Sequence, residues 1–344
     1  MATAAELSSA KEKAPSAARD LFASDSRIFS VGIGRRDSRY VWRAVRNVAR
    51  PRGCGSGRCL EVVAGLPVYY RDVRREPTFH VNVACSPTPR IPAPSQPRRV
   101  LRCGAQVQNY DCDVRQGQHQ GFMHKTLGTL GCFVRLSECD GGELALLSNA
   151  HVLCPRGDAR SADAIYSDGC TLRTPANDVA WYRAVHHCGL PVTSHKADAP
   201  EDGSSDWNEA DAALAILRDH IDHKQELSTP RGSRPLNGYA EAMPGDCVYK
   251  FGQQTRYTEG MVDAVAEIIR VPAPTPNSWY WFRNAFSVIA RTSSQNFTDF
   301  GDSGSVIVRE NDDMAVGLNF AGGSGLSFAN DMATVLKHLN CRLA

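Results

Sequence analysis

Short apolar runs separated by turn residues dominate the chain from about residue 103 onward. Most runs are rich in β-branched residues and are bounded by Gly, Asn or Asp, which is the pattern of strands joined by turns. Many short strands at this spacing favour an all-β sandwich or a pair of barrels. The last stretch, ANDMATVLKHL (329–339), instead has apolar residues at helical spacing and predicts a terminal helix. The strand-like runs are GTLGCFVRL, ELALLSNAHVL, DVAWYRAV, DAALAIL, DCVYKFG, GMVDAVAEIIRV, FSVIART, GSVIVRE and MAVGLNFAG.

The N-terminal part has a different texture. Residues 1–25 predict a polar, partly helical tail. RIFSVGIGRR predicts a strand, RYVWRAVRNVAR a strand or a helix, and CLEVVAGLPVYYRDV two short strands around a turn. CSPTPRIPAPSQPRRV (85–100) contains five prolines and predicts a linker. We therefore expect a small basic α+β domain over 26–100, with the linker at 85–100, and a β domain over 101–344.

Charge is distributed unevenly along the chain. The 344 residues carry a formal net charge of +2. Residues 26–102 hold sixteen Arg, no Lys and four acids, which leaves the remainder of the chain acidic. This asymmetry favours attraction between two docked parts. A nucleic-acid partner is the less favoured interpretation, because the arginines are scattered and form no recognised nucleic-acid motif.

Composition, with 42% hydrophobic and 22% charged residues, is that of a globular protein. No run approaches the roughly 20 apolar residues of a membrane span, and the start has no apolar signal segment. We therefore expect a cytoplasmic protein with no membrane partner and with reduced thiols among its twelve cysteines. The spacings closest to a metal site are Cys54 with Cys59, and His186, His187 and Cys188. Neither has a second pair at a suitable distance, so no metal or cofactor is predicted.

The stretch GDSGS (301–305) carries the candidate chemistry. It has the composition of a turn that exposes the hydroxyl of Ser303 beside backbone N–H groups. A serine needs a base, and the base needs a partner that holds its tautomer. His151 follows an apolar strand and three small residues in LALLSNAHVL. Asp211 opens DAALAIL, and Asp178 in NDVAWYRAV has a similar pattern, so either acid could be the partner.

Taken in order, SNAHVL, DAALAIL and GDSGSVIV resemble the motifs of chymotrypsin-fold (trypsin-like, PA clan) serine proteases. TLGTLGCFV, VYKFGQQTRYTEGMV and AVGLNFAG are similar to strands of a mostly intracellular microbial and plant group within that family. Its members often carry an N-terminal segment like SVGIGRR…VVAGLPVYY. The similarity covers most of residues 27–344. It implies a chymotrypsin-like double β-barrel with a small N-terminal α+β domain and a C-terminal helix.

The resemblance also implies roles for single residues. In the family layout the aspartate leads the strand after a long loop, which favours Asp211 over Asp178. The implied site consists of the triad His151, Asp211 and Ser303, the oxyanion-hole amides of Gly301 and Ser303, and the substrate-binding residues Phe297, Phe320, Ala321 and Gly322. Phe297 stands where trypsins place a pocket acid, and residues 320–322 resemble the edge that pairs with the substrate backbone.

The chain departs from digestive trypsins in two further respects. It has no Ile-Val-Gly-Gly-like segment after a basic residue, so Asp302 is expected to find another partner and activation by propeptide cleavage is not expected. The cysteines that usually flank the active serine are missing, which agrees with a reducing compartment.

These features predict a regulated intracellular serine endopeptidase of narrow specificity, acting on protein or peptide substrates. An autoinhibitory contact between the N-terminal domain and the barrels is a further expectation. The alternative is a non-catalytic protease-fold module whose basic domain contacts nucleic acid or a protein partner. An esterase is disfavoured because no Gly-x-Ser-x-Gly elbow is present.

Overall fold

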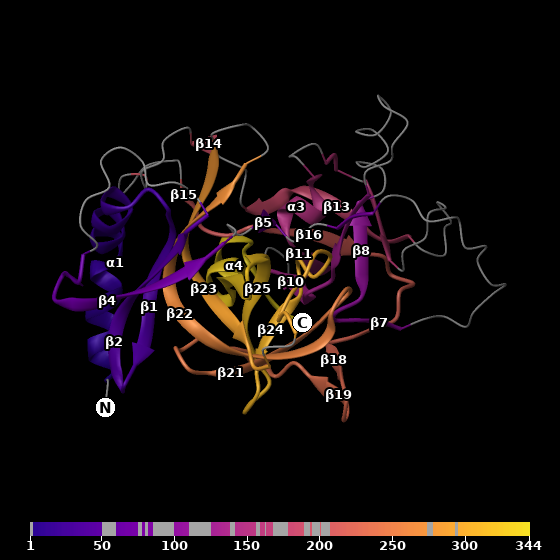
Figure 1. Ribbon diagram of the computed structural model, residues 1–344. Coiled ribbons are helices and arrows are strands. Elements are labelled where there is room, and N and C mark those ends of the chain that lie inside the picture. Colours follow the sequence, from indigo (N-terminus) through magenta and orange to yellow (C-terminus); the bar gives the residue numbers. More distant parts are fainter. Residues whose placement is uncertain are drawn as a thin grey trace.

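Strands dominate the fold, and two large sheets contain most of them (Figure 1). The computed structural model describes residues 3–49, 60–74, 78–79, 82–84, 100–109, 125–137, 142–155, 159–161, 163–167, 178–188, 193–194, 200, 207–273, 278–292 and 295–344. Helices lie near both ends, α1 (Ala4–Ser24) and α4 (Met332–His338), and α3 (Ala150–Leu153) forms a single turn. The predicted mostly-β fold with a helix near the C-terminus is confirmed.

Six consecutive strands close into a barrel within the described C-terminal residues. Neighbours pair antiparallel in the order β22–β23–β26–β25–β24–β21, and β21 pairs back to β22. Such closure leaves no free edge around the ring. The strands are β21 (Cys247–Gly252), β22 (Arg256–Pro272), β23 (Trp279–Ala290), β24 (Val306–Arg309), β25 (Met314–Gly323) and β26 (Leu326–Asp331).

The second sheet has the order β27-β10-β11-β16-β13-β12-β8-β9-β6. Only residues 130–131 separate β9 from β10 along the chain, so the two ends of this sheet adjoin and it curls into a second barrel. The predicted double barrel is thereby confirmed. Its strands are β6 (Asn82–Ala84), β8 (Gln106–Asn109), β9 (Lys125–Thr129), β10 (Cys132–Leu136), β11 (Leu144–Ser148), β12 (Ala164–Ser167), β13 (Asp178–Cys188), β16 (Ala212–Leu217) and β27 (Cys341–Leu343).

Shorter strands and the N-terminal strands complete the sheets. β1 (Ile28–Arg36) and β2 (Arg39–Asn47) form a hairpin, and β1 also pairs with β22. The segment RYVWRAVRNVAR (39–50), predicted to be a strand or a helix, thus forms a strand over Arg39–Asn47. The remaining strands are β3 (Val62–Val63), β4 (Leu66–Val73), β5 (Thr78–Phe79), β7 (Leu101–Arg102), β14 (Thr193–Ser194), β15 (Trp207–Asn208), β17 (His223–Lys224), β18 (Glu226–Thr229), β19 (Gly232–Pro235) and β20 (Gly238–Tyr239).

Helix α1 packs against the sheet formed by β1 and β22, as Figure 1 shows at the N-terminal end. The sequence predicted a polar tail over 1–25, and the structure instead buries one face of the helix. Small alanines make up most of that face, so the apolar stripe is weak in the sequence although its spacing is helical. The buried residues are Leu7, Ala10, Ala14, Ala17, Ala18, Leu21 and Phe22.

Residues 3–49 share a hydrophobic core with the C-terminal barrel. Leu21, Ile33 and Trp42 belong to the same buried cluster as Val262 and Val288. Whether residues 26–100 also fold as a separate domain stays a prediction, and most of the predicted linker, residues 85–99, lies outside the described residues. Among the helices of the described chain, none combines the length and apolar character needed to cross a membrane.

Ion pairs connect the basic N-terminal strands to the acidic barrel. Arg43 and Arg71 both contact the carboxylate of Asp263 on β22, and Lys11 on α1 pairs with Glu241. The Arg43 guanidinium is buried, whereas Arg71 lies 3.4 Å from Asp263 and is partly exposed. The charge asymmetry of the sequence therefore appears in part as attraction across this contact.

A buried acid, Glu267 on β22, lies where β1 and β23 flank the same strand. Its carboxyl group accepts hydrogen bonds from the hydroxyls of Ser30 (2.6 Å) and Ser287 (2.5 Å). Burial raises the pKa of Glu267 to about 7, despite these hydrogen bonds. The folded protein therefore retains a proton on Glu267 at pH values where the unfolded chain has lost it.

Replacing Glu267 by Gln should change the pH dependence of stability. A folded pKa of about 7 against an ordinary value of 4.5 means that rising pH lowers the wild-type free energy of unfolding across this window. As pH rises from about 4 to about 8, the free energy of unfolding of the Gln variant should increase by about 3 kcal/mol relative to that of wild type. Urea unfolding at several pH values measures this gain, with exposed Glu61→Gln as the control. Parallel curves for wild type and Glu267→Gln would contradict the assignment.

Candidate active site

His151 and Asp211 lie in direct contact at the ends of two paired strands. His151 is in α3, the single turn that follows β11, and its Nδ1 is hydrogen-bonded to Oδ2 of Asp211. The backbone N–H of His151 also donates to Oδ1 of Asp211 at 3.1 Å. The imidazole side chain is 15% exposed and the carboxylate only 5%. The buried acid therefore fixes the orientation of the imidazole, whose Nε2 is also buried.

Hydrogen bonds from both barrels hold Asp211 in place. The register Ser148↔Ala213 brings the ends of β11 and β16 together. The side-chain amide of Asn149 donates to the Asp211 carbonyl at 2.6 Å, and the Asp211 N–H donates to Oδ1 of Asn330 on β26 at 2.9 Å. Asp178, the rival acid, begins β13, and its side chain lies outside the described residues. Asp211 is thus the acid that the structure brings to His151.

Ser303 lies in a turn between two glycines with left-handed backbones, Gly301 (φ 104°) and Gly304 (φ 91°). Its hydroxyl donates to the carbonyl of Phe320 at 3.3 Å. The N–H groups of Asp302 and Gly304 donate to backbone carbonyls within this region. Among the described residues, no acceptor is found for the N–H groups of Gly301 and Ser303. This turn therefore leaves unpaired the two amides that were predicted to form the oxyanion hole.

The end of β9 ties this turn to the segment that carries His151. The N–H of Thr129 donates to the Ser303 carbonyl at 2.7 Å, and its hydroxyl donates to the Gly301 carbonyl at 2.8 Å. Gly128 lies between Ser303 and Val152, since a Cβ on Gly128 would be 3.0 Å from the Ser303 oxygen and 2.5 Å from the Val152 methyl carbons. The serine turn and the histidine helix thus contact the same glycine at the junction of the barrels.

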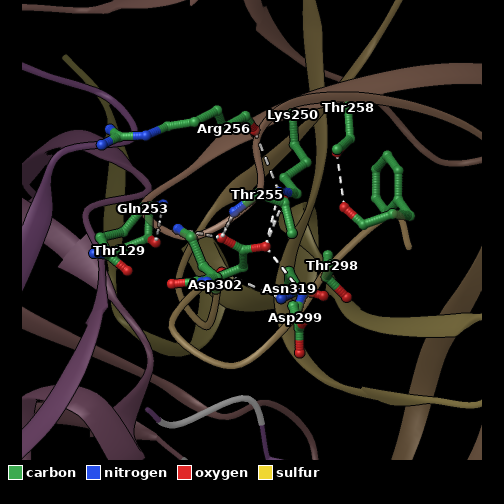
Figure 2. A network of polar contacts seen from close by, with 12 residues as sticks. Thr129, Lys250, Gln253, Thr255, Arg256, Thr258, Thr298, Asp299, Asp302 and Asn319 are labelled. Atoms are coloured by element: carbon green, nitrogen blue, oxygen red, sulfur yellow. Dashed lines mark hydrogen bonds and ion pairs between the residues drawn. The ribbon is translucent and has the colours of Figure 1, made fainter. Parts of the chain in front are cut away.

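Asp302, beside the serine, is the centre of a buried polar network, shown in Figure 2. Its carboxylate lies 3.0 Å from Nζ of Lys250, and both side chains are 0% exposed. It also accepts hydrogen bonds from the Thr255 hydroxyl at 2.6 Å and from the N–H groups of Gln254 and Asp299 at 2.9 and 3.0 Å. The partner that the sequence left open for Asp302 is therefore an internal lysine.

Opposing effects set the pKa values of this pair. Burial alone would raise the pKa of Asp302, but the attraction of Lys250 and the hydrogen bonds from Thr255 outweigh it and lower the pKa. Burial lowers the pKa of Lys250, and Asp302 offsets only part of that effect. Lys250 was not predicted from the sequence as part of the site. A single cation inside the apolar strand DCVYKFG was the available signal, because such a charge is costly to bury unless it is paired.

The predicted substrate-binding residues occupy two different environments. Phe297 is 1% exposed and packs in the core with Val288 and Ile307. Its role in a specificity pocket stays a prediction. Residues 320–322 lie in β25 close to the serine, and the Phe320 carbonyl accepts the Ser303 hydroxyl.

The residues that the structure describes contain no candidate metal site. No group of three or more His, Cys, Asp or Glu side chains is arranged there to hold a metal ion. Cys54 and Cys59 lie outside the described residues, and only the backbone of His186, His187 and Cys188 is described.

Comparison with known proteins gives similarity in structure and none in sequence. No protein-family model matches the chain, and no curated protein matches it. The Nocardiopsis protease structure is 14% identical, covers 71% of this chain and 99% of its own, and has a TM-score of 0.45. Protease A of Thermobifida fusca is 12% identical, with coverage of 72% and 99% and a TM-score of 0.44. An α-lytic protease homologue, N4, is 17% identical, with coverage of 72% and 100% and a TM-score of 0.44.

Replacing Lys250 by Met should destabilise the protein strongly. The variant leaves the Asp302 carboxylate buried without its cation, which typically costs about 3–5 kcal/mol. Chemical denaturation measures the loss, and Lys224→Met on exposed β17 serves as the control. The double variant Lys250→Met/Asp302→Asn should recover part of the loss. A single variant as stable as the control would show that the pair contributes little.

Proposed function

We propose that this chain is a serine endopeptidase in which Ser303 is the nucleophile, His151 the general base and Asp211 the residue that orients it. The observation that carries the proposal is the hydrogen-bonded His151–Asp211 pair beside a serine turn with two unpaired amides. The same residues were singled out by the order of three motifs in the sequence. Sequence and geometry therefore support one chemical assignment.

In the acylation step, Ser303 Oγ attacks the carbonyl carbon of the scissile peptide bond and its proton passes to Nε2 of His151. The hydroxyl must first leave the Phe320 carbonyl to which it now donates. Asp211 accepts the Nδ1–H hydrogen bond and stabilises the imidazolium. The N–H groups of Gly301 and Ser303 donate to the oxyanion of the tetrahedral intermediate.

The intermediate then collapses and the bond from carbon to the leaving amine breaks. The amine takes the proton from Nε2 of His151, which leaves an acyl-enzyme ester on Ser303. In deacylation, water gives its proton to His151 and attacks the ester. His151 then returns a proton to Ser303 Oγ as the carboxylic product departs.

The setting that we propose is a regulated intracellular protease of narrow specificity. The cysteines whose side chains are described, Cys103, Cys132, Cys154, Cys247 and Cys341, are free thiols, as is usual in a reducing compartment. The substrate would be a protein or peptide, because residues 321–322 of β25 pair with an extended backbone segment on the side away from β26, and a substrate strand could take that position.

A fluorophosphonate probe tests the proposed nucleophile. Wild type should be labelled, and Ser303→Ala should abolish labelling because it removes the proposed nucleophile. His151→Ala should reduce labelling to background, and Asp211→Asn should slow it by on the order of 10⁴-fold through loss of the correct tautomer. Ser305→Ala is a matched control, since its hydroxyl is buried in the same turn and has no hydrogen-bond partner among the described residues. Equal labelling of wild type and Ser303→Ala would refute the proposal.

The activity should also decline at alkaline pH, at values below the usual pKa of a lysine side chain. The lowered pKa of Lys250 means that its neutral form appears below the usual lysine value of about 10.4. Loss of that charge leaves Asp302 unpaired and releases the turn that presents the oxyanion-hole amides. A pH profile of kcat/KM should show this limb, and Lys250→Arg should move it to higher pH, because guanidinium does not titrate in this range. An identical limb in Lys250→Arg would rule out Lys250 as its origin.

A further inference from the structure

Strand β5 from the N-terminal region lies on the edge of β25 that was expected to bind substrate. Within β25, the pairing with β24 reaches only Leu318. β26 pairs with residues 321–322 on one side, and β5 pairs antiparallel with the same two residues, as Ala321↔Phe79 and Gly322↔Thr78. The backbone edge that a substrate would use is therefore already taken by this chain.

The next strand, β6, pairs with the barrel on the other side of Ser303. Its register with β9 is Asn82↔Leu127, Val83↔Thr126 and Ala84↔Lys125. β9 ends at Thr129, whose N–H and hydroxyl bind the Ser303 turn. The two short strands therefore lie on different barrels, β5 on β25 and β6 on β9.

Both pairings adjoin backbone that contacts the Ser303 turn. On β25, the partner of Phe79 is Ala321, which follows Phe320, whose carbonyl accepts the Ser303 hydroxyl. On β9, the partner of Asn82 is Leu127, which precedes Gly128, the glycine beside the Ser303 carbonyl. Phe79 and Asn82 are three residues apart, so they lie within about 11 Å of each other. The two strands thus flank Ser303 at peptide length.

Burial of the site agrees with this placement. Ser303 is 0% exposed, as are Phe320 and Ala321. A peptide can therefore reach the Ser303 hydroxyl only after residues around it move.

We propose that Thr78–Phe79 and Asn82–Ala84 bind at the active-site cleft as an internal competitive inhibitor, paired with β25 and β9 beside the Ser303 turn. The inference rests on the proposed protease function and adds its regulation. A tethered strand competes at a high effective concentration, so a weak contact is sufficient. An activating partner or substrate would need only to displace β5.

Proline substitutions in β5 test the inference. Thr78→Pro/Phe79→Pro removes two backbone N–H groups and disfavours strand pairing. We expect kcat/KM and the rate of fluorophosphonate labelling to rise at least tenfold, with the increase in kcat/KM arising mainly from a lower KM. Thr78→Ser/Phe79→Leu, which retains the backbone, is the matched control and should behave as wild type. Asn82→Pro in β6 provides an independent variant, and circular dichroism checks that each protein is folded.

A binding experiment separates failure of this inference from failure of the proposed function. A fluorescein-labelled peptide with the sequence of residues 78–84, TFHVNVA, is titrated into Ser303→Ala with and without the β5 prolines. Anisotropy should show at least tenfold tighter binding when the prolines are present, whether or not the wild type is catalytic. Ser303-dependent labelling that the prolines leave unchanged, together with equal peptide binding, would overturn the inhibitor and leave the protease. Absence of labelling in all folded variants, with tighter peptide binding to the proline variant, would overturn the protease and leave the occupied cleft.

Discussion

The buried ion pair between Lys250 and Asp302 is the constraint on which the candidate site depends. It connects β21, the turn after it and the serine turn, and a Cβ on neighbouring Gly252 would lie only 2.3 Å from Oδ1 of Asp302. Loss of either charge would leave the other buried without compensation. Because Asp302 is flanked by Gly301 and Ser303, fixing its carboxylate fixes the peptide units whose N–H groups would face an oxyanion. A requirement of charge burial thus becomes a requirement on the geometry of the site.

The sequence predicted features that depend on local pattern, and it predicted pairings less well. Strands around His151 and before Asp211 follow from apolar runs, and the Gly-Asp-Ser-Gly turn follows from residues that permit left-handed backbones. Local pattern alone did not separate Asp211 from Asp178. The family resemblance favoured Asp211, and the pairing of β11 with β16 is what brings that residue to His151. Lys250 was missed for the same reason, since its partner is 52 residues away along the chain. Alanine gives too little contrast for the buried face of α1 to stand out.

Domain organisation shows the same limit. A change in composition and a proline-rich stretch predicted a domain boundary near residues 85–100. Local composition does not predict which strands pair across that boundary. Long-range pairing adds β1 to the edge of β22, with Val31 opposite Ile268, and Arg43 reaches Asp263 across the contact. The N-terminal strands therefore extend a barrel sheet and share its core. This arrangement gives residues that follow β4 a fixed starting point from which to reach the cleft.

An active site of this kind can be controlled through formation of the oxyanion hole or through access to the nucleophile. Where the cation for the acid beside the serine arrives only after cleavage of the chain, an enzyme can be held inactive with an unformed oxyanion hole. Here Lys250 is part of the folded strand and is already paired with Asp302, so the turn is formed as soon as the barrel folds. The proposed restraint acts instead on access to Ser303. A strand paired with residues 321–322 of β25 would limit that access while leaving the turn, the base and the acid in place.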